Sequence, residues 1–352
     1  MFNLKRNLSA VVFVLASSLA ANACSVAKDT VASNESPAVQ TASPYSWTRV
    51  TESAAYPVGY NYPVFVANNR MWAFHNDGIW YSTDAKNWTK AKLPLVRRNP
   101  YEARYVQFNN AVYALGQNQG NYVDGIKFSS IVRRTTDFEK WEVVAEKSNL
   151  PDRVFYGSVV FDGKIWLLGG FDGKNYYNDV WNSSDGVRWT RVSPRAAWSP
   201  RNVGHIGNAV VFRNRIWIIG GGVIDGERTN NPKSNDEIWS SADGIKWTLE
   251  TDKPNISTLG TPIVFDEKLW LVGANRGDGN FARSSLVTTD GVTWREESAP
   301  WSPRGYVATW VFDNKLYITG GKYGGTKNQP NFIYSNDVWS MTAAPRNVAL
   351  LR

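Results

Sequence analysis

A seven-residue pattern that occurs five times constrains the fold of this chain more than any other feature. Each copy has Ser or Thr, any residue, Asp, three further residues and Trp, and the copies begin at Ser82, Thr135, Ser183, Ser241 and Thr288. A short run rich in β-branched and aromatic residues precedes each copy, and the Asp falls where a hairpin turn belongs. The pattern therefore predicts five antiparallel strand pairs, each joined by an Asp-containing turn.

A second hairpin pattern lies upstream of each pair and occurs six times. In the clearest copy, Val159–Trp166, Asp162 and Gly163 form the tip. The last aromatic residues of the copies are Trp72, Tyr113, Trp166, Trp217, Trp270 and Tyr317, at spacings of 41, 53, 51, 53 and 47 residues. Four strands per repeat at such a period are typical of propeller blades. We therefore expect an all-β, six-bladed β-propeller with four antiparallel strands per blade.

The sixth repeat lacks its own fourth strand, because neither the turn Asp nor the Trp follows Ser340. A matching segment lies near the N-terminus, where Ser46–Val50 (SWTRV) resembles the fourth-strand segment Arg188–Val192 (RWTRV). We expect this N-terminal strand to pair with blade six and close the ring, which protects the sheet edges. The propeller is assigned to residues 45–342 and a C-terminal tail to 343–352.

The Trp residues of the six fourth strands are expected to pack between neighbouring blades, since each buries roughly 150–250 Å² of surface. They are Trp47, Trp88, Trp141, Trp189, Trp247 and Trp294.

Paired glycines followed by Asn-Asp-x-Trp mark two of the repeats. They are Gly169-Gly170 with Asn178–Trp181, and Gly320-Gly321 with Asn336–Trp339. In these residues the chain resembles the kelch family of galactose-oxidase-like propellers, and the resemblance covers residues 46–341. It implies the propeller fold and says little about function.

Residues 1–23 are typical of a secretory signal. Lys5 and Arg6 supply the positive start, Leu8–Ala20 is apolar but too short to span a bilayer, and Ala21–Ala23 offers small residues for cleavage. The pattern predicts export from the cytoplasm.

Cys24, the only cysteine, directly follows the predicted cleavage site. This arrangement resembles a bacterial lipoprotein signal, which implies lipidation of Cys24 and anchoring in the bacterial envelope, at the outer membrane and facing the periplasm or the surface. Cleavage without lipidation is the alternative. Residues 24–44, rich in Ala, Ser, Thr and Pro, are expected to form a flexible tether.

The charge of the chain favours small acidic partners. Without Lys5 and Arg6 the 39 basic residues fall to 37 against 31 acidic ones, a net charge of +6. No Lys/Arg-rich run occurs, and export separates the protein from nucleic acid. We interpret the excess as favouring an anionic glycan, a small molecule or lipid headgroups, with simple solubility as the alternative.

Candidate ligand-binding residues are Arg153, Arg201, His205 and Arg304. In an antiparallel four-stranded blade the loops between strands two and three, and those between blades, emerge on one face. The strand-two-to-three spans run from 7 to 21 residues, and long variable loops mark a working face. The three arginines precede first strands on that face, where their guanidiniums would suit a carboxylate, sulfate or phosphate. Alternatively, they brace blade to blade through loop carbonyls.

The residue inventory excludes several chemistries. His75 and His205 are the only histidines, so no His/Cys metal cluster is expected, and we expect no cofactor. Galactose-oxidase chemistry needs histidine copper ligands and a Tyr–Cys crosslink and is therefore excluded. The repeated aspartates resemble the Asp-box of sialidases, but we interpret them as turn formers.

The leading hypothesis is a non-catalytic binding propeller outside the cytoplasm, with a glycan, an anionic small molecule or a protein on its long-loop face. The alternative is an enzyme: the resemblance to periplasmic kelch propellers that include sialic-acid mutarotases (N-acetylneuraminate epimerases) implies Glu227 as acid/base, with Arg228, Arg201 or Arg304 as the carboxylate-binding group. A third hypothesis is a structural component of an envelope complex, with loop aromatics such as Tyr176 and Phe332 at the interface.

Overall fold

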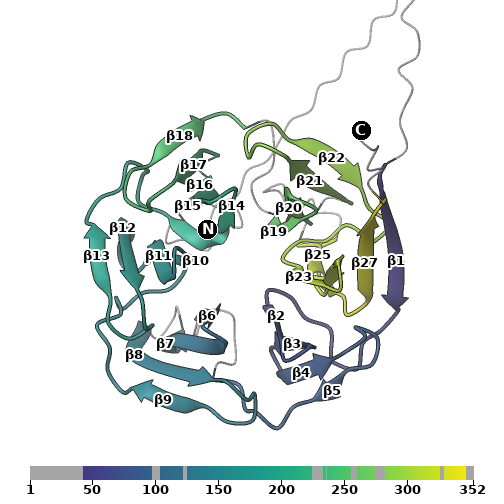
Figure 1. The fold of residues 1–352 in the computed structure, drawn as a ribbon, viewed down its shortest axis with the longest axis horizontal. Helices are drawn as coiled ribbons and strands as arrows, with labels where there is room; N and C mark the ends of the chain where they lie inside the picture. Colours follow the sequence, from purple (N-terminus) through teal and green to yellow (C-terminus); the bar gives the residue numbers. More distant parts are fainter. Residues whose placement is uncertain are drawn as a thin grey trace, which may run out of the picture. The chain divides into compact units, whose positions relative to one another are not determined.

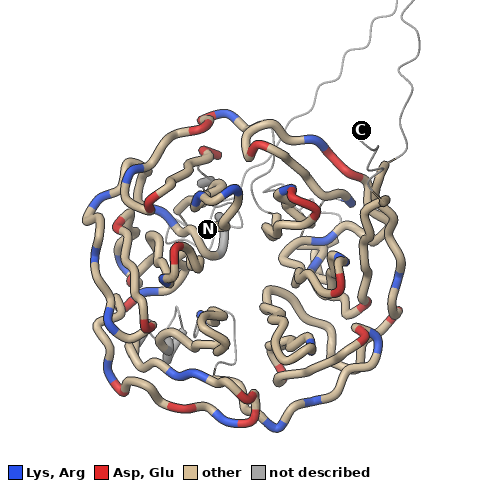
Figure 2. Tube along the Cα trace, viewed as in Figure 1, with Lys and Arg blue, Asp and Glu red and all other residues tan. Residues whose placement is uncertain are grey.

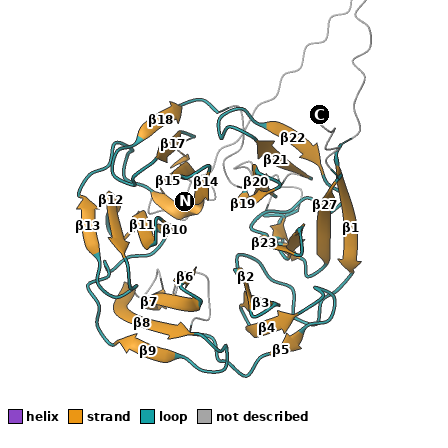
Figure 3. Ribbon diagram, viewed as in Figure 1, coloured by secondary structure: helices purple, strands orange, loops and turns teal. Residues whose placement is uncertain are grey.

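The structure is a computed structural model that describes residues 43–96, 104–121, 125–223, 233–234, 236–254, 260–273, 281, 283–325 and 329–345. For residues 117–121, 125–127, 205–208 and 233–234 only the backbone is described. Every regular element in these ranges is a β-strand (Figure 3). No helix in the described ranges is long and apolar enough to cross a membrane.

Six antiparallel sheets are arranged around a centre, each running from an innermost strand to a rim strand (Figure 1). Blade one contains β2 (Val64–Ala67), β3 (Arg70–His75), β4 (Gly78–Ser82) and β5 (Thr89–Lys90). Blade two contains β6 (Arg104–Phe108), β7 (Ala111–Asn121), β8 (Gly125–Thr135) and β9 (Glu142–Ala145). Blade three contains β10 (Gly157–Phe161), β11 (Lys164–Phe171), β12 (Tyr176–Ser183) and β13 (Thr190–Ser193).

The remaining blades follow the same order. Blade four contains β14 (Asn202–Phe212), β15 (Arg215–Val223), β17 (Ile238–Ser241) and β18 (Thr248–Thr251), and β16 (Lys233–Ser234) also pairs with β15. Blade five contains β19 (Thr261–Phe265), β20 (Lys268–Val272), β21 (Ser284–Thr288) and β22 (Arg295–Ser298). Blade six contains β23 (Ala308–Phe312), β24 (Lys315–Thr319), β27 (Val338–Ala343) and, at its rim, β1 (Tyr45–Thr51).

Ring closure by the N-terminal strand is confirmed. Strand β1 pairs antiparallel with β27, and Trp47 stands opposite Met341 in the register. The six-bladed, four-stranded architecture expected from the repeats is therefore confirmed as well.

Tight two-residue turns join the first and second strands of every blade. Both central residues have positive φ in all six turns, namely Asn68-Asn69, Asn109-Asn110, Asp162-Gly163, Arg213-Asn214, Asp266-Glu267 and Asp313-Asn314. Positive φ at both positions defines the type I′ turn, whose twist matches that of the flanking strands, and Asn, Asp and Gly tolerate it best. These residue types therefore set the strand register.

The repeated aspartates have the hydrogen bonds of turn formers. Asp185 Oδ1, for example, accepts hydrogen bonds from the backbone N–H groups of Val187 and Arg188, at 2.8 Å each. In the equivalent turns, burial alone would raise the pKa values of Asp84 and Asp290, but bonds of this kind outweigh burial and lower both to about 2. These carboxylates are ionised, bonded within their own turns, and lie at the opposite end of the strands from the long loops.

The hydrophobic core consists of six clusters, one at each junction between neighbouring blades. Each cluster contains one of the six predicted fourth-strand Trp residues, which confirms their packing role. Trp88 and Trp189 are buried, whereas the other four are half-buried.

Some spans expected to be loops contain strands. The span from Tyr113 to Val132 is mostly an extension of β7 and β8, in which Gln117–Asn121 pairs with Gly125–Ser129. In blade six, β25 (Lys322–Tyr323) and β26 (Ile333–Tyr334) form a small ribbon. Backbone groups in these spans pair with each other instead of with water, so part of the long-loop face is a fixed surface.

Candidate functional site

The propeller has two dissimilar faces. One face carries the type I′ turns and the Asp turns, and we call it the turn face. The other face carries the connections between strands two and three and between blades, and we call it the long-loop face. Arg153, Arg201 and Arg304 belong to the long-loop face, because each precedes the first strand of its blade.

The three predicted arginines each meet a carboxylate at the third strand of their own blade. Arg153 Nη1 lies 2.5 Å from Asp179 Oδ1, Arg201 binds Glu237, and Arg304 binds Asp337 with both terminal nitrogens. Each guanidinium also donates to the carbonyl oxygen of a paired glycine: Gly169, Gly220 and Gly320, at 3.1, 3.3 and 3.3 Å. The contacts are those of a brace that joins the strand-one approach to strands two and three.

A Trp two residues after each acid completes the brace. The indole N–H groups of Trp181, Trp239 and Trp339 donate to Asp179, Glu237 and Asp337 at 2.7, 3.0 and 2.8 Å. Burial alone would raise the pKa of Glu237, but the bonds from Arg201 and Trp239 outweigh it and hold that pKa below its usual value. The signal for this arrangement is the acid-x-Trp spacing at the start of the third strand.

The contacts of the three arginines therefore support a bracing role, but each brace lies within one blade and uses a carboxylate as well as a carbonyl, and does not run from blade to blade. The Arg201 side chain is fully buried, and those of Arg153 and Arg304 are 8% and 3% exposed. A ligand anion at any of them would have to displace a bonded carboxylate.

Other predicted residues lie outside the described part of the chain. Cys24, Glu227 and Arg228 are not described, and His205 is placed only as a backbone position within β14. Their assigned roles stay predictions.

Blade one builds a related cluster around Asp77. Its Oδ1 lies 2.6 Å from His75 Nδ1 and accepts a 3.0 Å hydrogen bond from the Trp80 indole, and its Oδ2 lies 3.0 Å from Lys90 Nζ. His75 is only 2% exposed. Burial lowers the pKa of His75, although Asp77 opposes this effect.

The lowered pKa of His75 predicts a loss of stability at mildly acidic pH. Because the unfolded chain binds the proton more tightly than the folded one, stability is complete above about pH 6.5 and falls as the pH drops below that value. We expect the denaturation midpoint to fall between pH 7 and pH 5, and to fall less in His75→Asn, which keeps a donor for Asp77. Equal pH dependence in both proteins would contradict this assignment.

A different arrangement occurs where blade six meets blade one on the long-loop face. The Lys322 ammonium lies over three aromatic rings, with Nζ 4.3 Å from the centroid of Phe332, 4.8 Å from that of Tyr60 and 5.0 Å from that of Tyr306. Tyr334 stacks on Tyr60 with the centroids 5.5 Å apart. We call these five residues the aromatic–lysine cluster.

Lys322 has no carboxylate partner among the described residues. Burial lowers its pKa, so the ammonium is partly desolvated. Ring faces attract a cation but give its three N–H groups no oxygen acceptor. This distinguishes Lys322 from the braced arginines.

The backbone around the cluster is fixed. Tyr306 has a φ of 56°, a left-handed conformation that is rare for a bulky residue, and its carbonyl accepts a 2.9 Å hydrogen bond from Asn61 N–H. Gly305 and Lys322 exchange two backbone hydrogen bonds of 3.0 Å. Such strained positions persist where the surrounding structure over-determines them, and they tend to occur at functional sites.

Two members of the cluster and two residues beside it have exposed apolar side chains. Phe332, Ile333 and Tyr334 are 43%, 51% and 37% exposed. Val58 is 52% exposed and precedes Gly59, which pairs with Ser335 next to Tyr334. Phe332, Ile333 and Tyr334 together with Val58 therefore form a local exposed apolar patch. Such patches mark interaction sites.

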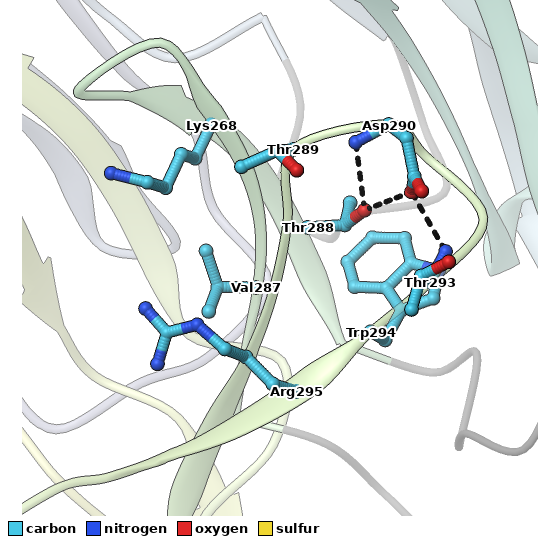
Figure 4. A pocket seen from close by; sticks show the side chains of 8 residues that line it. All are labelled: Lys268, Val287, Thr288, Thr289, Asp290, Thr293, Trp294 and Arg295. Carbon is cyan, nitrogen blue, oxygen red and sulfur yellow. Dashed lines mark hydrogen bonds between the residues drawn. The ribbon is translucent and has the colours of Figure 1, made fainter.

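A hollow of about 280 Å³ lies on blade five (Figure 4). It is a weaker candidate for a ligand site than the aromatic–lysine cluster. Lys268 and Arg295 line the hollow, but Lys268 Nζ is 2.7 Å from Asp266 and Arg295 is paired with Glu297. Asp290 and Trp294 on the opposite wall belong to a turn of the repeated type (Figure 4). Its charges are neutralised by neighbours.

In the described part of the chain, neither a charge cluster nor a set of metal ligands marks a second site. Basic and acidic positions are interspersed through the blades and not gathered on one of them (Figure 2). Within the described ranges, no group of three His, Cys, Asp or Glu side chains is placed to hold a metal ion.

Fold and bracing contacts together define a kelch-type β-propeller. The chain belongs to the DUF6242 beta-propeller domain family, whose model matches residues 28–259. The solved structure of YjhT superposes with a TM-score of 0.63 over 83% of this chain and 97% of that chain, at 14% identity, which supports the fold.

Two curated proteins show related sequences. The spermatocyte protein spe-26 of Caenorhabditis elegans is 27% identical over 204 residues, which is 56% of this chain and 33% of that protein. The Kelch-like protein terF of Aspergillus terreus is 22% identical over 214 residues, which is 55% of this chain and 45% of that protein. The matches thus extend over less than half of the length of either relative.

Proposed function

We propose that this protein is a non-catalytic binding module and that the aromatic–lysine cluster on its long-loop face holds an acidic glycan. The observation that carries the proposal is the Lys322 ammonium, enclosed by three aromatic rings and without a carboxylate partner in the described ranges. We further propose that the module acts outside the cytoplasm on a lipid anchor, on the basis of the sequence pattern of residues 1–44.

The chemistry of the cluster matches both parts of such a ligand. Aromatic faces such as Tyr334, 37% exposed, suit the apolar C–H face of a sugar ring. Lys322 supplies three N–H donors in partly desolvated surroundings, where a carboxylate oxygen would interact more strongly than in water. A carboxylate bound there would also raise the pKa of Lys322 towards its usual value.

The fixed backbone favours recognition of a preformed shape. Because Tyr306 and Lys322 are positioned by backbone hydrogen bonds, little conformational freedom is lost when a ligand binds. A neutral sugar would use only the rings, and a small anion only the lysine. An acidic glycan uses both.

Binding should depend on the cluster in a defined way. We expect purified protein to show a higher melting temperature with uronic-acid- or sialic-acid-containing oligosaccharides than with their neutral counterparts, since a ligand at one hundred times its Kd adds about 2.7 kcal/mol. Lys322→Met should weaken the acidic ligand at least about tenfold, equivalent to about 1.4 kcal/mol. Tyr334→Ala should weaken acidic and neutral ligands alike.

Ile245→Ala is the matched control, because Ile245 is 48% exposed but lies in an Asp turn on the turn face. It should bind as the wild type does. If no acidic glycan binds, or if Lys322→Met binds unchanged, the proposal fails, and capture of a protein through the Phe332–Tyr334 patch becomes the next hypothesis to test.

A further inference from the structure

Arg104 lies in the first strand of blade two and reaches two other blades. Its Nε donates a 3.0 Å hydrogen bond to Ser158 Oγ on β10, and its Nη1 donates a 3.3 Å hydrogen bond to the Gly204 carbonyl on β14. These three strands are the innermost of their blades, around the middle of the ring (Figure 1). The side chain therefore belongs to the wall of the central region.

The charge of Arg104 is not compensated in the way that the braced arginines are. Arg153, Arg201 and Arg304 each meet an acid, whereas Arg104 has no carboxylate partner among the described residues. Its two hydrogen bonds use two of the five N–H donors of a guanidinium. The other three lack an acceptor within the described ranges.

Desolvation lowers the pKa of Arg104. By exposed area the residue is half-buried, and a partly desolvated charge is costly unless it is paired. The equivalent register positions in other blades are Gly157, Thr261 and Ala308, all uncharged. Ring architecture alone therefore does not require a cation there.

The backbone that Arg104 contacts is held in a fixed form. Phe155 has a φ of 60°, and its carbonyl accepts hydrogen bonds from Val203 N–H at 3.1 Å and Gly204 N–H at 2.8 Å. A Cβ atom at Gly204 would lie 2.1 Å from the Tyr156 carbonyl oxygen, so only glycine fits. The Gly204 carbonyl thereby fixes the orientation of the Arg104 guanidinium.

We propose that Arg104 is the binding group for a small oxyanion, a carboxylate or a phosphate, in the central region of the ring. The planar guanidinium presents parallel N–H donors that match two oxygens of either anion. Ser158 and Gly204 orient the guanidinium through Nε and Nη1 and leave its three other N–H donors for the ligand. This site goes beyond the proposed glycan function and does not depend on it.

The test compares melting temperatures of the purified protein in sodium phosphate, sodium acetate and sodium chloride at equal pH and ionic strength. We expect phosphate or acetate to raise the melting temperature by about 2 °C or more over chloride at saturation. The anion that raises the melting temperature shows whether the site binds a phosphate or a carboxylate. Arg104→Gln should abolish the rise, and Arg104→Lys, which keeps the charge without the fork, should weaken the apparent affinity at least about tenfold.

Arg188→Gln is the control, because the Arg188 side chain is 91% exposed. An equal rise in Arg104→Gln and Arg188→Gln would mean a general salt effect and would overturn the proposal. Absence of any rise in the wild type would also overturn it, and Arg104 would then be a strap between blades. If Arg104→Gln does not fold, the Arg104→Lys variant decides the question. An unchanged anion affinity in that variant would contradict recognition by the guanidinium.

Discussion

Arg304→Ala is expected to lower the free energy of unfolding by about 3–5 kcal/mol. The side chain is 3% exposed and binds Asp337 through both terminal nitrogens, and it also donates to the Gly320 carbonyl at 3.3 Å. Its removal leaves a largely buried carboxylate with only the Trp339 indole as a partner. Urea denaturation followed by Trp fluorescence measures the loss.

Two further variants separate the brace from a general charge effect. Arg304→Met combined with Asp337→Asn is expected to recover about half of the loss, because no unpaired charge remains and Asn still accepts from Trp339. Arg49→Ala breaks an exposed pair with Glu52, whose side chains are 49% and 79% exposed, and should cost about 1 kcal/mol or less. Equal losses of unfolding free energy in Arg304→Ala and Arg49→Ala would show that the brace stabilises the protein no more than an exposed ion pair does.

Trp189→Ala is expected to destabilise the protein by about 3–5 kcal/mol. Trp189 is 3% exposed and lies in the cluster between blades two and three, together with Leu115 of blade two and Ile165 of blade three. Its backbone is also held by Asn149, whose side chain bonds both its N–H and its carbonyl at 2.7 Å. A cavity at this junction removes apolar contacts from two blades at once.

Trp141→Ala provides a graded comparison, because Trp141 holds the same repeat position at the junction of blades one and two but is half-buried. It should cost less than Trp189→Ala, since less apolar surface is lost. An unchanged denaturation midpoint in Trp189→Ala would refute the packing role of these residues.

The architecture was predictable because each blade repeats the same local chemistry. Asn, Asp and Gly at the hairpin tips set the turn type, and the Ser/Thr-x-Asp…Trp copies placed the outer strands. The N-terminal segment was assigned to blade six by its likeness to Arg188–Val192, and the observed register confirms the pairing. The β7–β8 extension was missed, since Gln117–Ser129 lacks the alternation that indicates a half-buried strand.

The candidate sites were less accessible to sequence analysis, because they depend on which side chains meet between segments distant in the sequence. The position of Arg153, Arg201 and Arg304 on the long-loop face was predicted, but their partners were not, although the acid-x-Trp spacing carried that signal. Comparison of the repeats offered two further clues. Lys322 follows the paired glycines where blade three has Phe171, and Arg104 stands where blade three has Gly157.

The pairing of β1 with β27 also determines the order in which the protein can assemble during synthesis. Strand β1 precedes every other strand of the ring in the chain, but its partner β27 comes last, so in a chain that emerges N-terminus first β1 stays an unpaired edge while five blades form. Contacts so distant along the chain form slowly, because a long loop must close first. A chain that ends before Val338 therefore keeps an open strand that can pair with a neighbouring chain, and only the arrival of β27 covers it.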